Sequence, residues 1–303
     1  MADTLIRGLS KDGYIKIVGV STTELTERAR NIHFTLPLGT AALGRTLAAA
    51  SMMGSQIKND LGSVTIRING GGPLGSVIAV SDNNGNVRGY VQDGSVDIPL
   101  KPNGKLDVSG GIGTDGLLTV IRDNGKDLPF TGQIELVSGE IAEDIAAYYV
   151  QSEQIPTVCA LGVLVDTDQS VKQAGGFILQ LMPGAPEPYI DILEDRIIQM
   201  KGITNELEKH GSIEKVVEEL MWGFDFEVLE KHEIKYECKC SREKVEKAFI
   251  SMGREELTNL MNDDKPIEAT CNFCDVIYKF TNEDIEELLK KSKKGIDISS
   301  RVW

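Results

Sequence analysis

The residues best suited to chemistry in this 303-residue chain are four cysteines in its last third. Cys238 and Cys240 form a CxC pair, and after 30 intervening residues Cys271 and Cys274 form a CxxC pair. Four thiolates are the number that zinc takes in a closed tetrahedral site. Residues i and i+2 of an extended chain face the same side, so even the CxC pair can direct both sulfurs to one ion. The spacing therefore predicts a zinc site with four cysteine ligands.

The same thiols also allow redox chemistry. A disulfide between Cys238 and Cys240 would be strained and easily reduced again. Lys235, Lys239 and Arg242 surround this pair and would favour the thiolate, which is the form that oxidants attack. Spacing alone favours a constitutive structural zinc-ribbon adaptor over a redox-active centre. A thiol–disulfide oxidoreductase using CNFC is a third interpretation, although a thioredoxin-like βαβ pattern does not surround that motif.

The remaining cysteine and the histidines give weaker signals. Cys159 lies in the apolar run IPTVCALGV and is predicted to be a buried core thiol. His33, His210 and His232 are scattered along the chain, and none accompanies a serine or cysteine nucleophile motif. His33 adjoins an apolar run and is interpreted as a structural residue. No acid–base pair has a spacing that argues for catalysis, so an enzyme is not predicted.

Two glycine motifs resemble nucleotide-binding loops without meeting their requirements. The stretch GTAALGRT, residues 39–46, is one residue short of a phosphate-binding loop and has Arg45 in place of the lysine. The stretch GIGTDG, residues 111–116, completes GxGxxG, but the sequence after it predicts a strand rather than the required helix. Neither motif predicts a nucleotide partner.

Charge and composition exclude several classes of partner. The formal net charge is −14, and basic residues do not cluster, so nucleic acid is not an expected partner. No stretch approaches 18 consecutive apolar residues, so a transmembrane helix is not expected. The N-terminal sequence lacks a basic region followed by an apolar run, and a secretory signal is therefore not predicted. We expect a cytoplasmic protein whose thiols are kept reduced.

Residues 1–185 are predicted to form an α+β domain, because β-rich runs alternate with a few amphipathic or small-residue helices. The stretch 82–86, DNNGN, is a hairpin signal. Helices are expected at residues 23–34, 38–57 and 140–151. Strands are expected at residues 14–20, 64–68, 74–80, 87–91, 106–108, 117–122, 133–137, 158–165 and 177–181.

Residues 186–232 are predicted to be a helical and acidic linker that follows the proline-rich stretch MPGAPEP. Gly211 fits a helix C-cap, and Ser212 can cap the next helix. The apolar residues that recur along this segment are Ile190, Leu193, Ile197, Met200, Leu207, Ile213, Val216, Val217, Leu220, Met221, Trp222, Phe224, Phe226 and Leu229. One interpretation is that these residues pack on the main domain. The other is that a signal releases them from it, and both can hold for the same segment.

Residues 233–303 are predicted to be a small α+β zinc domain. Ser241 can cap a helix that ends at Gly253, and a second helix, marked by Leu257, precedes the CxxC pair. Val276, Tyr278 and Phe280 then alternate as in a strand, and Thr281 can cap a last helix. So small a segment has a modest core, and a metal would supply part of its stability.

Beyond the cysteines, long stretches of the chain resemble the heat-shock protein 33 family of redox-regulated bacterial chaperones. The resemblance rests on LGRTLAAASMMGSQIK, GGGPLGSVIAVSDNNGNVRGYV, GQIELVSGEIAEDIAAYYVQSEQIPT and AGGFILQLMPGAPE, and on CKC and CNFC in the zinc domain. It extends over nearly the whole length and includes all four cysteine positions.

The resemblance implies a function in the stress response. In the reduced form, Cys238, Cys240, Cys271 and Cys274 would hold one zinc ion per chain and the chaperone would be nearly inactive. Under oxidant, disulfides Cys238–Cys240 and Cys271–Cys274 would form, and zinc would be released. The zinc domain and then the linker would lose structure and expose apolar surface. This surface would bind unfolding client proteins without ATP, and the active form would be a homodimer.

Overall fold

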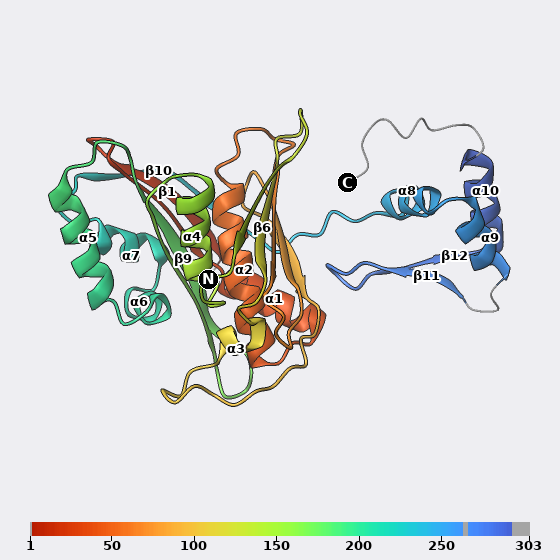
Figure 1. Cartoon of the computed structure of the whole chain (residues 1–303), viewed down its shortest axis with the longest axis horizontal. Coiled ribbons are helices and arrows are strands. Elements are labelled where there is room, and N and C mark those ends of the chain that lie inside the picture. Colours follow the sequence, from red (N-terminus) through yellow and green to blue (C-terminus); the bar gives the residue numbers. More distant parts are fainter. Residues whose placement is uncertain (1, 263–265, 293–303) are drawn as a thin grey trace. The chain divides into compact units, whose positions relative to one another are not determined.

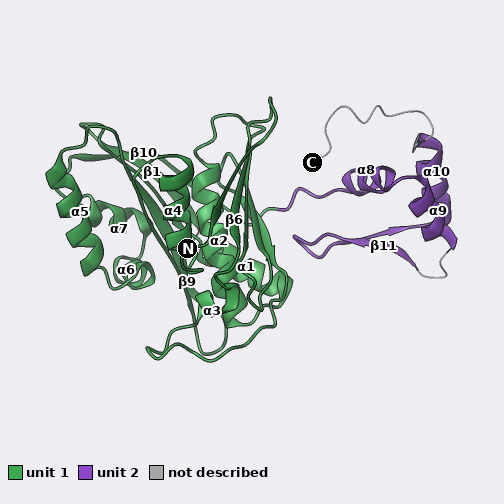
Figure 2. Ribbon diagram, in the orientation of Figure 1, with its two compact units in different colours: residues 1–237 green, residues 238–303 purple. Residues whose placement is uncertain are grey.

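The computed structural model of the chain describes residues 2–262 and 266–292. They belong to two compact units with bounds at residues 1–237 and 238–303, coloured green and purple in Figure 2. Each unit combines helices with antiparallel strands (Figure 1), which confirms the predicted α+β class. We predicted that the first unit consists of a core, residues 1–185, and a linker, residues 186–232. This division concerns function and stays a prediction.

Sheet A of the first unit has the strand order β10-β1-β2-β9-β8, and its neighbouring strands are antiparallel. Its strands are β1 (Thr4–Ser10), β2 (Ile15–Ser21), β8 (Thr157–Val165), β9 (Val171–Leu181) and β10 (Phe226–Glu233). Segments from the beginning, the middle and the end of the unit therefore meet in one sheet, with β10 at its edge.

Sheet B has the strand order β5-β4-β3-β6-β7. Its strands are β3 (Ser63–Asn69), β4 (Val77–Asp82), β5 (Val87–Val91), β6 (Leu117–Asp123) and β7 (Phe130–Glu135). Between β4 and β5, the Asp82 carboxylate accepts the Asn84 and Asn86 amides at 3.0 and 3.1 Å. Gly85 lies in the left-handed region at φ 75°, so the predicted hairpin turn is confirmed.

Helix α2 (Pro37–Gly54) contacts both sheets and forms the centre of the main core. Every residue of this helix except Pro37 and Arg45 is buried. Its small residues allow close packing, as predicted: a Cβ on Gly44 would lie 2.6 Å from the Thr26 side chain and 2.7 Å from Val163. Helices α1 (Thr23–His33) and α4 (Ala142–Ser152) complete this core.

A second core lies on the other face of sheet A, beneath helices α5 (Glu187–Gln199), α6 (Ile203–His210) and α7 (Ile213–Leu220) (Figure 1). The sheet contributes Ile15, Ile17, Phe177 and Leu179, and the helices contribute Leu193, Ile203, Leu207, Ile213, Val216, Val217 and Leu220. Most of the apolar positions of the predicted linker are thus buried against sheet A. The predicted caps are also present, because Gly211 ends α6 at φ 74° and the Ser212 side chain accepts the Lys215 amide.

The second unit contains α8 (Arg242–Met252), α9 (Arg254–Asn262), the hairpin β11 (Ile267–Thr270) and β12 (Ile277–Phe280), and α10 (Asn282–Ser292). As predicted, the Ser241 side chain caps α8 by accepting the Lys244 amide, and α8 ends at Gly253. The Thr281 hydroxyl accepts the Asp284 amide at 3.2 Å at the start of α10. The buried apolar residues of this unit, within the described part, are Phe249, Leu257, Ile267, Phe280, Ile285 and Leu288.

Several predicted elements are wrong. Residues 106–108 do not form a strand, because the Asp107 carboxylate accepts the Gly110 amide and starts the short helix α3 (Val108–Ile112). The apolar residues from Ile190 to Leu207, which recur at helical spacing, are divided between two helices, because the chain leaves helical geometry at Met200 and Gly202 takes φ 110°. Residues 226–232 of the predicted helical linker lie in strand β10, and β1 was not predicted.

Within residues 2–262 and 266–292, no helix is long and apolar enough to cross a membrane.

Candidate metal centre

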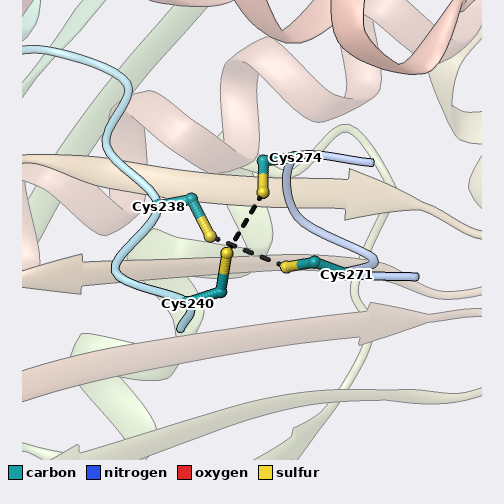
Figure 3. Close-up of side chains that lie close together, drawn as sticks. All are labelled: Cys238, Cys240, Cys271 and Cys274. Carbon is teal, nitrogen blue, oxygen red and sulfur yellow. Dashed lines mark hydrogen bonds between the residues drawn. The ribbon is translucent and has the colours of Figure 1, made fainter. Parts of the chain in front are cut away.

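The four predicted ligand cysteines lie on two short backbone segments of the second unit (Figure 3). Cys238 and Cys240 lie in the extended stretch before α8, and Cys271 and Cys274 lie in the turn between β11 and β12. This turn is closed by backbone hydrogen bonds, since the Cys271 carbonyl accepts the Cys274 and Asp275 amides at 3.2 and 2.8 Å. Asp275 adopts the left-handed conformation at φ 55°, which lets the turn lead directly into β12.

The four sulfur atoms lie within 4.8 Å of one another. The Sγ atoms of Cys238 and Cys271 are 3.7 Å apart, and those of Cys240 and Cys274 are 3.4 Å apart. A regular tetrahedron with zinc–sulfur bonds of about 2.3 Å has edges of about 3.8 Å. The sulfur spacing therefore fits a tetrahedral ion. All four thiols are free, and the two close contacts shown in Figure 3 join one pair to the other.

The cysteines differ in acidity because their surroundings differ. Burial opposes a charge on Cys240, but the Tyr278 hydroxyl and the neighbouring thiols donate to its sulfur and lower its pKa to about 7. Burial raises the pKa of Cys238 and of Cys274. Among these three thiols, Cys240 most readily becomes the thiolate that a metal requires.

Tyr278 is the residue of this site that the sequence did not identify. Its hydroxyl donates to Cys240 Sγ at 3.1 Å from strand β12. The predicted strand alternation placed Tyr278 and Phe280 on one face of the strand. The sequence alone does not indicate that this face lies against Cys240. The Tyr278 hydroxyl donates to Cys240, and the Tyr278 ring packs against the small core. Tyr278 therefore connects the cysteine cluster to that core.

The basic residues expected near the first pair make other contacts as well. Arg242 forms an ion pair with Asp284 at 2.9 Å, and its guanidinium lies 4.2 Å from the centre of the Phe280 ring. Lys235 pairs with Glu237 at 3.3 Å. Arg242 therefore contributes to the packing of α8 against β12 and α10, in addition to any effect of its charge on the cysteines.

Comparisons with known proteins cover almost the whole chain. A family model described as Hsp33 protein matches residues 3–281. A 33 kDa chaperonin of Clostridium perfringens is 48% identical over 297 residues, which make up 98% of this chain and 93% of that protein. The chain belongs to the Hsp33 family. A 33 kDa chaperonin of Clostridium beijerinckii is 43% identical over 293 residues, or 97% of this chain and 100% of that protein.

The fold agrees with this family. The crystal structure of the 33 kDa chaperonin (heat shock protein 33 homolog) of Thermotoga maritima matches with a TM-score of 0.87 at 36% identity. The match covers 97% of this chain and 100% of that one. The resemblance noted in the sequence is therefore confirmed, and the Hsp33 family and the relatives' names indicate a chaperone, a class of protein that is generally not enzymatic.

The other residues singled out in this Hsp33 family member have structural roles. Cys159 is half-buried on β8, packs against the main core, and has a raised pKa because of burial. His33 Nε2 lies 2.9 Å from the Gly89 carbonyl and 3.2 Å from the Tyr236 hydroxyl, as expected for a structural histidine. Residues 39–46 lie inside helix α2, where Arg45 pairs with Glu140 at 2.7 Å.

A second group of metal-binding residue types lies between α6 and α7. His210 Nε2 lies 3.5 Å from the Glu206 carboxylate and also contacts the Glu219 carboxylate. Lys209 pairs with the same two carboxylates at 3.6 and 3.2 Å. Because this lysine already neutralises charge at the position, the group is best described as an ionic contact that joins the two helices.

Proposed function

We propose that this chain is a redox-regulated, ATP-independent holdase chaperone that binds unfolding proteins during oxidative stress in the cytoplasm. The observation that carries the proposal is the gathering of four thiols, from CxC and CxxC, in a unit whose described residues form a small core. Membership of the Hsp33 family supports the chaperone class. The acidic net charge of −14 supports protein clients over nucleic acid.

In the resting state, Cys238, Cys240, Cys271 and Cys274 would hold one zinc ion as thiolates. Bound zinc supplies charge neutralisation and a covalent-like link between the two backbone segments that carry the pairs. Four thiolates around a divalent ion leave a formal charge of −2, and the hydroxyl of Tyr278 would stabilise the part on Cys240. The ligands would remain protected from oxidants for as long as the site stays closed.

Activation would be an oxidation of the thiols. In each pair, two thiolates, one hydrogen peroxide and two protons from the solvent would give one disulfide and two water molecules, with the electrons passing from sulfur to peroxide. The proposed disulfides are Cys238–Cys240 and Cys271–Cys274. The close sulfur contacts of the reduced structure run between the pairs, so these bonds require the side chains to turn toward the partner within each pair.

Loss of the site would spread into the linker. The second unit would no longer be held by its metal, and residues 226–237 precede Cys238 directly in the chain. Helices α5, α6 and α7 cover a large apolar face of sheet A, which includes Ile15, Ile17 and Phe177. Their release would expose this face to unfolding clients, and a homodimer would be the active form.

The decisive experiment compares zinc, thiols and chaperone activity on one sample. The reduced, zinc-loaded protein is treated with hydrogen peroxide at elevated temperature. Zinc is measured with a chromogenic chelator, free thiols are counted, and aggregation of a heat-unfolded client is followed by light scattering. We expect four thiols and one zinc ion to be lost per chain while aggregation is suppressed. Zinc release without suppression would instead favour a constitutive structural zinc-ribbon adaptor.

Two controls make this experiment specific. The Cys159→Ser variant should keep the zinc content and the activation of the parent, because Cys159 lies in the main core. Peptide mapping of the oxidised protein should find disulfides within each pair. Disulfides between Cys238 and Cys271, or between Cys240 and Cys274, would contradict the proposed pairing.

A further inference from the structure

Strand β10 is the least buried strand of sheet A. In β1, Leu5, Ile6, Gly8 and Ser10 are buried, whereas along β10 half-buried and exposed side chains alternate. Phe226 and Val228 pack against the edge of the core beneath α7, and Leu229 is 63% exposed where the register shifts between Arg7 and Gly8. Side-chain packing therefore contributes little to holding β10, and its backbone ladder to β1 contributes a larger share.

The neighbouring strand β1 has a shape that accepts an aromatic side chain. A Cβ on Gly8 would lie 2.1 Å from the ring of Phe226, so the ring occupies the space that a side chain at this position would fill. Arg7 forms an ion pair with Glu230, and Lys231 forms one with Glu214 of α7. The edge of β1 thus offers backbone hydrogen-bonding groups, a notch where Gly8 has no side chain, and the guanidinium of Arg7.

The residues directly after β10 fix this strand in place. The Ile234 amide donates to the Asp3 carbonyl at 3.0 Å. The buried Tyr236 hydroxyl donates to the Gly89 carbonyl at 2.8 Å and accepts the Gly89 amide at 3.3 Å. Around Val87, the Val87 amide donates to the Lys235 carbonyl at 3.0 Å, and the Glu237 amide donates to the Val87 carbonyl at 2.8 Å. Residues 234–237 therefore form a short anchor on the edge of sheet B.

The anchor lies next to the proposed switch. Tyr236 precedes Cys238 by two residues, so loss of order at Cys238 reaches the anchor without an intervening element. If the anchor detaches, β10 keeps its sparse side-chain packing, its ladder to β1 and partly exposed ion pairs such as Arg7–Glu230 and Lys231–Glu214. Residues 226–237 would then leave together and expose the backbone groups of β1 and β5 at two sheet edges.

We propose that the edge of β1, with the notch at Gly8, is a binding site for extended segments of unfolding polypeptide, and that β10 occupies it in the resting chain. This proposal rests on the chaperone function proposed above and adds the place and mode of client binding. The occupant is argued from β10 itself, an extended segment that pairs with β1 along its length and packs Phe226 and Val228 against the core. Strand addition uses backbone hydrogen bonds, which any unfolded chain can supply, so the site fits clients of many sequences.

The test uses a fluorescein-labelled peptide of residues 226–237 and the full-length protein, with binding measured by anisotropy. Two further peptides carry N-methyl groups at alternate positions, one on the amides that face β1 and one on the amides between them. We expect saturable binding to the oxidised protein and binding weaker by at least about tenfold for the reduced, zinc-loaded protein. Methylation on the β1-facing amides should weaken binding by a similar factor, and methylation on the others should not.

Two results would overturn the proposal. Equal binding of the two methylated peptides would show that side chains alone, and not the backbone ladder, hold the peptide. Failure of a chemically unfolded client to displace the unmethylated peptide would show that clients do not use this edge. A peptide in which Phe226 is replaced by alanine should bind more weakly, because it leaves the notch at Gly8 empty.

A variant that opens the edge without oxidant separates this proposal from the redox switch. The Tyr236→Ala variant should bind the peptide while reduced and zinc-loaded, even if the protein does not respond to peroxide. If Tyr236→Ala does not fold, Tyr236→Phe removes only the hydroxyl, and faster amide hydrogen exchange over residues 226–237 is the expected result. Tyr189→Phe is the matched control, because its hydroxyl donates to Asp12 at 2.6 Å from helix α5. Unchanged amide hydrogen exchange over residues 226–237 in Tyr236→Phe would show that residues 234–237 do not hold β10 in place.

Discussion

The two units of this chain reach a folded state with very different cores. The first buries dozens of apolar side chains around α2 and beneath α5–α7. In the second, the described residues include six buried apolar side chains. A small domain buries a smaller fraction of its surface, so its hydrophobic stabilisation barely exceeds the entropy that folding costs. The small core of the second unit is consistent with the proposed role of the cysteine cluster as an additional cross-link.

This comparison also explains why a switch would be located in the second unit. A protein part whose stability depends on one ion changes state when that ion is lost, whereas a large core does not respond to a local chemical change. In the first unit, α5–α7 cover one face of sheet A with a core of their own, while the other face packs on the core around α2.

Metal removal should give the largest effect. A chelator added to the reduced protein should unfold residues 238–303 and leave the core around α2 folded, because structural zinc sites contribute roughly 10–16 kcal/mol of apparent binding energy. Amide hydrogen exchange resolves the two units. Cys238→Ser should weaken zinc strongly, whereas Cys159→Ser should not. Persistent protection of residues 238–303 after chelation would show that their small core suffices.

Matched aromatic truncations should give the next largest effect. Phe280→Ala and Phe177→Ala each remove a buried ring, at a cost of about 3–5 kcal/mol. We expect the second unit of Phe280→Ala to be unfolded without zinc, as in the parent, and to fold with zinc at a lower free energy of unfolding. Phe177→Ala should lower the unfolding free energy of the first unit equally in both conditions. Denaturant titrations with and without zinc measure this, and a zinc-independent loss in both variants would contradict the comparison.

The pH dependence of two aspartates should give the smallest effect, with opposite signs. Burial raises the pKa of Asp3 to about 6, although the Leu25 amide donates to it at 2.7 Å. The folded state then binds its proton more tightly than the unfolded chain, so stability falls as pH rises from about 4 to about 6, by about 3 kcal/mol. Backbone and side-chain hydrogen bonds from Thr281 lower the pKa of Asp284, so its contribution is lost as pH falls below about 4.

Replacing each aspartate with asparagine isolates these effects. Asp3→Asn should flatten the fall in stability of the first unit between pH 4 and 6, measured by urea unfolding. Asp284→Asn should remove an acid-dependent loss of stability in the second unit. A parallel pH response of wild type and Asp3→Asn would show that the Asp3 carboxyl is not the group that titrates.

The sequence predicted those parts of the fold that depend on local signals. In each of these signals a side-chain oxygen accepts a backbone amide two or three residues further along the chain. All of them are present, namely the caps at Ser212, Ser241 and Thr281 and the turn at Asp82. Strands β1 and β10 were missed because their pairing joins residues at opposite ends of the unit. The charged sequence of β10, FEVLEKHE, has little of the apolar alternation that marks a strand.

The site was predicted in its ligand types and not in its surroundings. Cysteine spacing restricts which sulfurs can meet, so the cluster of Cys238, Cys240, Cys271 and Cys274 follows from the sequence. The donation from Tyr278 to Cys240 depends on how the β11–β12 hairpin packs against the stretch before α8, and spacing does not encode that packing. For the same reason, the sequence did not predict the ion pair that Arg242 forms with Asp284.

Three glycines under the linker helices give sheet A a surface that a single methyl group would disturb. A Cβ on Gly19 would lie 2.8 Å from Ile213, one on Gly162 would lie 2.6 Å from Ile203, and one on Gly175 would lie 2.8 Å from Leu207. An alanine at Gly19 would push against α7 and leave Cys238, Cys240, Cys271 and Cys274 unchanged. In such a variant, the effects of displacing α5–α7 could be studied without any oxidant. The proposed oxidation of the thiols would then be separated from the structural change proposed to follow it.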